Sequence, residues 1–189
     1  MQRTVSPMRR QAAASRAAAD SFIKPEKRHS HMARQSFNET FSLEIPDSFQ
    51  PLGEEDFRRL SANGGGPYQW GVRDPENHRL IIAMWKPYPA LLSLLADLKT
   101  MAKKNAQLTA KAYEGHGYRF LGFFTPRAGE AKAEGYRYAY DENGTVQVVD
   151  TFLFRSGKII YAFLCSGREA SAEADHTLFC QVLESLEWI

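Results

Sequence analysis

Residues 132–165 decide the fold, and they read KAEGYRYAYDENGTVQVVDTFLFRSGKIIYAFLC. Three stretches of strand length, rich in Tyr, Phe, Val and Ile, are separated here by two turn sequences. Asn143-Gly144 favours a type I′ turn, and Ser156-Gly157 is also suited to a tight hairpin. Connections this short join only antiparallel neighbours, so the pattern predicts a meander of strands at 132–140, 145–155 and 158–165.

Further strand patterns precede this meander along the chain. Each combines apolar side chains with bounding turn residues. These predicted strands cover residues 40–45, 68–72, 79–85, 108–113 and 118–125. Pro75 lies between the second and third of them, at the second turn position, where its fixed φ is favourable. That pair is therefore predicted to be a hairpin.

Two longer segments have the three- and four-residue spacing of an amphipathic helix. They cover residues 89–104, where lysines gather toward the C-terminal end, and residues 172–187, with Ser171 as the expected N-cap. A shorter helix is predicted at residues 54–63. The fold class that follows is α+β: an α/β/α sandwich with a meandering antiparallel sheet of five or more strands and two main helices packed on it.

The first 35 residues differ in composition from the rest of the chain. They hold eight Lys or Arg and two acidic residues, whereas the other 154 residues hold 16 basic and 20 acidic ones. Low hydrophobicity with high charge predicts a disordered basic tail at residues 1–35. The same composition would also arise if the start had been assigned too far upstream, with Met32 as the true start. A weak likeness to an organelle presequence is the alternative. Residues 36–189 are predicted to form a single domain.

Composition also restricts the partners and the compartment. The mildly acidic net charge of residues 36–189 argues against nucleic acid as a partner. The chain has no secretory signal pattern and no apolar run long enough for a membrane span. Cys165 and Cys180 are both expected to be reduced core residues, since each lies on an apolar side of its element. These features predict a cytoplasmic location.

Candidate catalytic and metal-binding patterns are weak. Cys165-Ser166-Gly167 lacks the strand-to-helix elbow of hydrolases, and Gly64-Gly65-Gly66 lacks the Lys-Ser/Thr of a phosphate loop. His176 and Cys180 have the spacing of a metal pair on a helix, but no second pair accompanies them. His116, between two glycines, is interpreted as an exposed turn residue and not as a base or ligand. We therefore predict no catalytic residue, no metal and no cofactor.

An aromatic stripe is the strongest candidate for a binding site. Side chains two apart on a strand share a face, and two neighbouring predicted strands each carry three rings at this spacing. The six candidates are Tyr118, Phe120, Phe124, Tyr136, Tyr138 and Tyr140. Such rings are often covered by a helix, but Tyr in place of Leu or Val is also typical of interfaces. The sequence leaves open whether the stripe is core or exposed.

The chain resembles the superfamily that includes the photosystem II PsbP protein, the Ran-binding Mog protein, bacterial DcrB-like proteins and the EagR-type chaperones. The matching segments are Phe41-Ser42-Leu43-Glu44-Ile45-Pro46 with Phe49, the strand start at residues 157–161, and the helix closing at residues 179–186. The resemblance covers roughly residues 37–189. It implies an α/β/α sandwich and a non-enzymatic role in binding, assembly or chaperoning.

Two functions remain in view at this point. The first is a protein-binding, assembly or chaperone-like module acting through the aromatic stripe. The alternative is a module that binds a small apolar ligand or lipid between the aromatic strands and a helix. A closed pocket lined by Tyr118, Phe120 and Tyr138 favours the ligand, and a flat exposed patch favours a protein partner.

Overall fold

The computed structural model describes residues 31–37, 40–62, 66–88 and 97–189. Its main feature is an eight-stranded sheet in which neighbouring strands are antiparallel. The order is β3 (Gln50–Pro51), β4 (Trp70–Asp74), β5 (Arg79–Pro87), β10 (Ile159–Arg168), β9 (Thr145–Ser156), β8 (Ala131–Glu142) and β6 (Arg119–Phe124), with β7 (Arg127–Ala128) also on β8. The predicted meander is confirmed as β8, β9 and β10.

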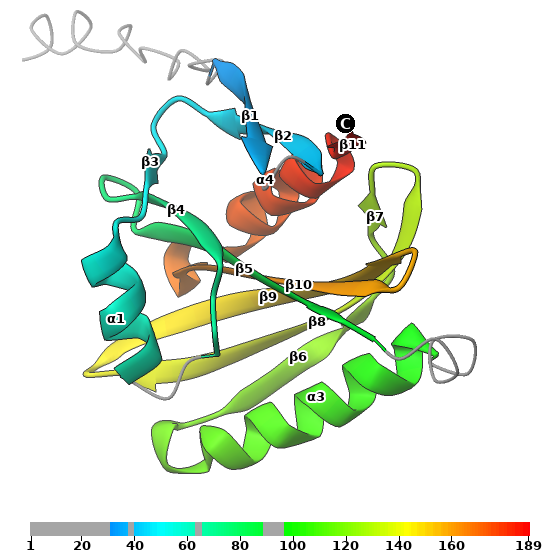
Figure 1. Cartoon of the computed structure of the whole chain (residues 1–189). Coiled ribbons are helices and arrows are strands. Elements are labelled where there is room, and N and C mark those ends of the chain that lie inside the picture. The colour runs from blue at the N-terminus through cyan, green and yellow to red at the C-terminus, as the bar shows by residue number, and fades with distance from the viewer. Residues whose placement is uncertain (1–30, 38–39, 63–65, 89–96) are drawn as a thin grey trace, which may run out of the picture.

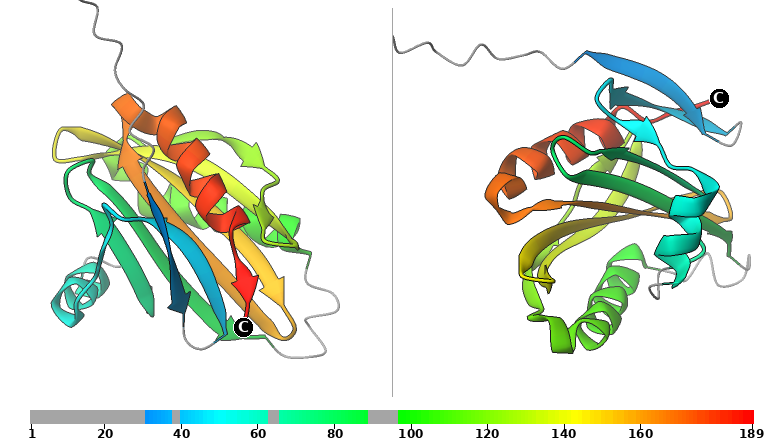
Figure 2. Two further views of the ribbon diagram at one scale, coloured as in Figure 1. Left: turned by 90° about the horizontal axis from the view of Figure 1, so that it is seen from above. Right: turned by 90° about the vertical axis from the view of Figure 1, so that its left-hand side faces the viewer.

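Both faces of this sheet are covered, as Figure 1 and Figure 2 show. One face, here called the α4 face, carries α4 (Ala172–Glu184) and a small sheet of β1 (Met32–Phe37), β2 (Phe41–Pro46) and β11 (Glu187–Trp188). The opposite face, here called the α3 face, carries α3 (Leu98–Ala112). The third helix, α1 (Glu54–Ala62), lies beside β3 and β4. The predicted α+β class and its layered sandwich are confirmed.

Two tight turns set the register of the meander. Asn143 and Gly144 have φ of 54° and 84°, as a type I′ turn requires, and Glu142 pairs with Thr145 across them. In the second turn Gly157 has φ of 54°, and Ser156 pairs with Ile159. Because strand side chains alternate, these registers direct the even-numbered residues of β9 to the α4 face and the odd-numbered ones to the α3 face.

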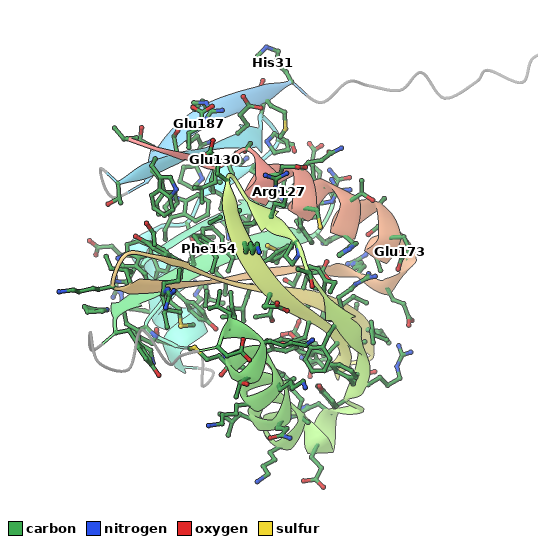
Figure 3. The ribbon with its side chains drawn as sticks, turned by 90° about the vertical axis from the view of Figure 1, so that its right-hand side faces the viewer. His31, Arg127, Glu130, Phe154, Glu173 and Glu187 are labelled. Carbon is green, nitrogen blue, oxygen red and sulfur yellow. The ribbon has the colours of Figure 1, made fainter. Side chains whose placement is uncertain are left out.

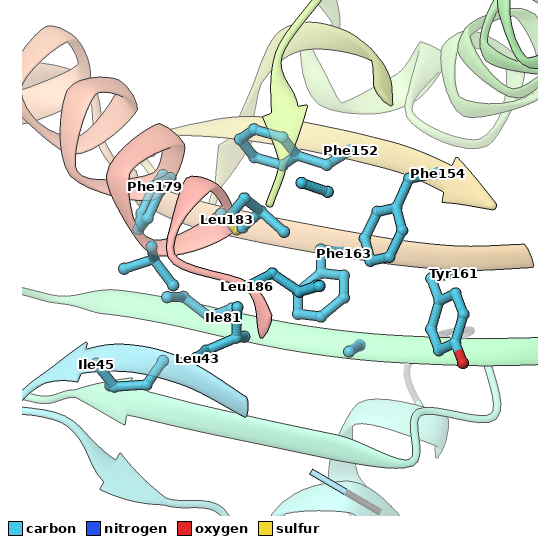
Figure 4. Close-up of a cluster of buried hydrophobic side chains, with 14 of the residues drawn as sticks. Leu43, Ile45, Ile81, Phe152, Phe154, Tyr161, Phe163, Phe179, Leu183 and Leu186 are labelled. Carbon is cyan, nitrogen blue, oxygen red and sulfur yellow. The ribbon is translucent and has the colours of Figure 1, made fainter. Parts of the chain in front are cut away.

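The larger core lies between the sheet and the α4 layer (Figure 4). The rings of Phe154 and Tyr161 stack at its centre with centroids 5.1 Å apart. Burial of each large apolar side chain contributes about 1.5–3 kcal/mol, so this core holds α4 and the small sheet against β5, β9 and β10. Its main members are Leu43, Ile45, Ile81, Phe152, Phe154, Tyr161, Phe163, Phe179, Leu183 and Leu186.

On the α3 face, α3 begins at Leu98, which lies in the second half of the helix predicted at residues 89–104. Asp97 is the N-cap, because its carboxylate accepts hydrogen bonds at 3.2 Å from the backbone N–H groups of Lys99 and Thr100. The first part of the predicted helix, residues 89–96, lies outside the described residues.

The same helix continues to Ala112, so the predicted strand at residues 108–113 is wrong. Ala102 and Ala106 are buried against the sheet from successive turns of α3. Four of the six residues at 108–113 are Leu, Ala or Lys, which have high helix propensity, and this outweighs the short apolar alternation of the segment.

The small sheet was only partly predicted. β1 starts at Met32, ahead of the predicted domain boundary at Ser36, and pairs with β2 along its whole length. α4 ends at Glu184, three residues before the predicted end, and the chain then adds β11, where Trp188 pairs with Phe41. β11 has only two residues, and the polar and apolar residues of β1 do not alternate regularly, so neither strand has a periodic pattern that could have predicted it.

A buried ion network joins α4 to the sheet. The carboxylate of Asp150 is 3% exposed and lies 2.8 Å from Arg137 Nε and 3.1 Å from His176 Nδ1. Burial raises the pKa of Asp150, and the nearby His176 and Arg137 oppose that shift. Arg137 also reaches Glu173 in the first turn of α4, at 3.0 Å. The network therefore fixes the N-terminal half of α4 over β8 and β9.

The other end of α4 is held by the turn between β7 and β8. Figure 3 shows Arg127 and Glu130 of this hairpin beside one end of α4, and Glu173 at the other. Gly129 donates its backbone N–H to the Leu183 carbonyl at 3.0 Å. Its φ of 56°, and the 2.1 Å that would separate an added Cβ from the Leu186 carbonyl oxygen, explain why this position requires glycine.

Replacing Leu183 with Ala should destabilise the domain by about 2–5 kcal/mol, because the side chain is fully buried between α4 and the sheet. Urea denaturation followed by circular dichroism measures this change. Gln181→Ala, at an exposed position on the same helix, is the matched control and should change stability by no more than about 0.5 kcal/mol. Equal effects of the two substitutions would contradict the described packing of α4.

Arg137→Met should cost about 3 kcal/mol or more at neutral pH, because it leaves the Asp150 carboxylate buried with only His176 beside it. Below the raised pKa of Asp150 the carboxyl group is neutral, so the loss should shrink as the pH falls through that value. Denaturation of the wild type and the variant at several pH values measures the difference. Adding Asp150→Asn to the variant should restore part of the stability at neutral pH. A loss that is the same at every pH would contradict this assignment.

Candidate functional site

The six candidate rings do not form one surface. Tyr136 and Tyr138 are buried beneath α3, with 4% and 3% of their surface exposed. Tyr118 and Tyr140 are half-buried at the ends of the same row. Phe120 is 45% exposed on β6. The stripe is thus core at its centre and accessible at its edges, so the structure divides it between the two interpretations.

Phe124 was assigned to the wrong face. A bulge at Leu121 shifts the register, so Phe120 pairs with Tyr138 whereas Phe124 pairs with Gly135. Its ring therefore lies on the α4 face, 5.2 Å from the ring of Phe152. Strict alternation along the strand could not reveal this, because a bulge exchanges the two faces.

Gly135 accounts for the position of the Phe124 ring. An added Cβ at Gly135 would lie only 2.5 Å from the ring, so the ring occupies the space that a side chain would fill. At the bulge itself Gly122 has φ of 139°, a conformation that other residues rarely adopt. The two glycines together permit the change of face.

The tyrosines on the α3 face form a continuous layer, here called the tyrosine layer, of Tyr113, Tyr118, Tyr136, Tyr138 and Tyr140. Tyr138 is at its centre, with ring centroids 5.7–6.2 Å from Tyr118, Tyr136 and Tyr140. The hydroxyl of Tyr136 lies 3.1 Å from the hydroxyl of Thr109, and Tyr118 donates to the Ala106 carbonyl at 3.5 Å, both on α3. Polar contacts as well as ring packing thus attach α3 to the sheet.

At the edge of this layer lies an exposed apolar patch, here called the β6 strip, of Phe120, Leu121 and Phe123. Their exposed fractions are 45%, 44% and 50%. The bulge places the rings of Phe120 and Phe123 on the same face, with centroids 4.8 Å apart. β6 is the last strand of the sheet, and no other described strand pairs with its outer edge. Leu121 and Phe123 were not among the candidates predicted from the sequence, although apolar residues on both faces of one strand could have indicated an exposed apolar patch.

A cleft of about 660 Å³, here called the tyrosine cleft, opens at the other end of the layer, between α3, the sheet and the segment that follows α1. Leu80, Ile82, Val149 and Leu164 form its apolar floor. Tyr68, Tyr113, Tyr138 and Tyr140 form its aromatic walls, and Asp141, Glu142 and Asn143 lie at its rim. Tyr118 and Phe120 do not line it. Of the three residues whose presence in a pocket would favour a ligand, Tyr138 alone lines this cleft, together with Tyr140 from the six candidate rings.

Sequence reasoning missed Tyr68 and Tyr113 as cleft residues. Tyr113 was assigned to a strand, whereas it is the C-cap of α3, with its ring 4.4 Å from that of Tyr140. Burial, together with Glu142 and the neighbouring tyrosines, raises the pKa of both Tyr113 and Tyr140, so both hydroxyls are neutral near neutral pH. No local pattern connects Tyr68 with the other three rings, because they meet only through the tertiary fold.

A thiol, an imidazole and a carboxylate lie in succession, as in the catalytic triad of a cysteine hydrolase; they belong to Cys180, His176 and Asp150. The Sγ atom of Cys180 lies 3.8 Å from His176 Nε2, and His176 Nδ1 lies 3.1 Å from Asp150. However, burial and the charge of Asp150 raise the pKa of Cys180 to about 11, which keeps the thiol protonated and weakly nucleophilic. Asp150 is also engaged by Arg137, and the Phe124 ring packs edge-on against His176. These contacts favour a structural role for the trio.

The cysteines, the possible metal ligands and the helices also bear on the expectations from the sequence. Both cysteines are free, and Cys165 is fully buried. Within the described residues, no cluster of three or more His, Cys, Asp or Glu side chains is positioned to hold a metal ion. None of the helices in the described part of the chain is both long and apolar enough to cross a membrane.

Comparison with known proteins gives a match in structure only. No protein-family model and no curated protein matches the sequence. The structure is similar to that of the cyanobacterial PsbP protein CyanoP from Synechocystis sp. PCC 6803, with a TM-score of 0.64, 11% identity, and coverage of 85% of this chain and 94% of CyanoP.

Two further solved structures are similar. The Ran-binding protein Mog1p of Saccharomyces cerevisiae has a TM-score of 0.53 and 10% identity, with 84% of this chain and 95% of Mog1p covered. LpqN of Mycobacterium tuberculosis, involved in cell envelope biogenesis, has a TM-score of 0.50 and 16% identity, with 85% of this chain and 91% of LpqN covered. Identities this low show a shared fold alone. The chain has a PsbP/Mog1-like fold, which confirms the resemblance seen in its sequence.

Proposed function

We propose that this protein is a non-enzymatic binding or chaperone-like module that recognises an extended segment of another protein along β6. The observation that carries this proposal is the β6 strip, three adjacent apolar side chains that are about half exposed on a terminal strand of the sheet. Exposed apolar edge strands promote aggregation unless a partner covers them, so their presence marks an interaction site.

The geometry of β6 suits the addition of a strand. One edge of β6 pairs with β8, and the backbone groups of the opposite edge face outward without a described strand beside them. A partner strand would gain main-chain hydrogen bonds along this edge and side-chain contacts with Phe120 and Phe123. The two rings lie on one face, so they would contact alternate side chains of the added strand.

Proteins of similar fold support a role in protein binding. Mog1p, which shares this fold, is a Ran-binding protein. At 10% identity this similarity transfers no contact residue and no partner. The proposal therefore rests on the β6 strip of this chain, and the fold serves as a precedent.

The alternative, a module for a small ligand, is supported by the tyrosine cleft. Its volume of about 660 Å³ is within the range of small-molecule sites. The β6 strip and the cleft share no residue, so each can be disrupted without the other.

Phe120→Ser/Phe123→Ser should abolish capture of one defined protein from native lysate by the full-length chain while leaving the fold intact, because both side chains are exposed. Quantitative mass spectrometry of the captured proteins measures the loss. The purified partner should then bind the wild type at least tenfold more tightly than the variant, as two truncated aromatic contacts of 1 kcal/mol or more together predict.

The control is Ile189→Ser, which removes an even more exposed apolar side chain on the small sheet's side of the molecule. It should retain the partner. Equal recovery by both variants, or no specific partner at all, would contradict the proposal. Light scattering tests a further outcome. If the wild type and Ile189→Ser have twice the mass of one chain, and Phe120→Ser/Phe123→Ser has the mass of a single chain, the strip is instead a contact between two copies of this chain.

A further inference from the structure

The tyrosine cleft has an unusual lining for an apolar pocket. Its floor is aliphatic, formed by side chains of β5, β9 and β10 such as Ile82, Val149 and Leu164. Such a floor favours the apolar body of a ligand, since its burial removes apolar surface from water. The volume of about 660 Å³ fits a small molecule.

The aromatic walls of the cleft favour a ligand with a particular charge. Tyr113, Tyr138 and Tyr140 pack on one another with ring centroids 4.4–6.2 Å apart, and Tyr68 also lines the cleft. An aromatic ring presents a negative face, so a group that contacts the accessible faces of these rings is stabilised when it carries positive charge. Clusters of this composition bind alkylated ammonium groups.

Charge at the rim agrees with this preference. Asp141 and Glu142 both line the cleft, and its described lining residues include His116 but no Lys or Arg. Asp141 is held in place because its Oδ1 accepts the Gly144 N–H at 2.7 Å. Glu142 is exposed, and its charge acts on both Tyr113 and Tyr140. None of the ion pairs among the described residues involves Glu142.

We infer that the tyrosine cleft binds a small organic cation, an alkylated ammonium group carried on an apolar body. The ammonium group lies among Tyr113, Tyr140 and the carboxylate of Glu142, and the apolar body lies over Leu80, Ile82 and Leu164. The bound cation supplies the positive charge that the rim lacks. This site is separate from the β6 strip and does not depend on protein binding there.

Two probes of the same shape test this inference with the full chain. Para-hydroxyphenyltrimethylammonium carries the cation, and para-tert-butylphenol replaces its nitrogen by carbon and is neutral. The cationic probe should bind about tenfold more tightly than the neutral one, as two cation–π contacts and one carboxylate predict. Titration followed by NMR locates the site through the methyl signals of Ile82, Val149 and Leu164.

Variants distinguish the contributions. Glu142→Gln should weaken binding of the cationic probe several-fold and leave the neutral probe unchanged, and it should not disturb folding because Glu142 is exposed. Tyr140→Leu should weaken the cationic probe more than the neutral one. Glu184→Gln, which removes an exposed carboxylate from α4 on the opposite face, is the charge-matched control and should change neither affinity.

The outcomes separate clearly. Tighter binding of the cation that depends on Glu142 supports the inference. Equal or tighter binding of the neutral probe would show a purely apolar pocket and overturn it, as would binding of neither probe or unchanged cation affinity in Glu142→Gln. None of these results bears on β6, because Phe120 and Phe123 lie outside the cleft.

Discussion

The need to bury both faces of one antiparallel sheet governs this structure. Along β9, from Val148 to Phe154, successive side chains are buried although they point alternately to opposite faces. A strand with this pattern cannot leave either face in water, so the chain must provide a layer on each side. The α4 layer and α3 are the two solutions, and they differ in completeness.

The α4 face is covered by a helix and a second sheet, whereas the α3 face has one 15-residue helix among its described elements. α3 lies over β8 with small residues, Ala102 and Ala106, which permit a close approach but cover little area. At one side of it the floor residues of β5 and β10 remain accessible as a cleft. At the other side Phe120 and Phe123 extend beyond its cover. Both candidate binding features thus arise from the limited width of a single helix.

Local chemistry determined which parts of this architecture could be predicted from the sequence. Asn143-Gly144 and the glycine at 157 require positive φ, so the meander and its antiparallel register followed from the residues themselves. The face on which Phe124 lies could not be predicted in this way. It depends on the bulge in β6 and on Gly135 of β8, whose missing side chain leaves room for the Phe124 ring. The exposure of Phe120 and the burial of Tyr136 also depend on where α3 ends, and the helix was predicted to end at residue 104, whereas α3 continues to Ala112. The sequence therefore indicated an aromatic stripe on neighbouring strands, but not which of its rings are buried and which are accessible.

The use of tyrosine explains how the incompletely covered face remains stable. A ring buried at one edge and exposed at the other loses little if its polar end has a partner or reaches water. Tyr136 finds Thr109 as a partner and Tyr118 finds the Ala106 carbonyl, so neither hydroxyl is buried without a hydrogen bond. At the cleft, the rings of Tyr68, Tyr113, Tyr138 and Tyr140 carry hydroxyl groups, whereas Phe or Leu there would make the walls wholly apolar. The tyrosine walls thus combine aromatic faces with polar hydroxyls, and this distinguishes the α3 face from the larger core beneath α4, whose main members are mostly Phe, Leu and Ile.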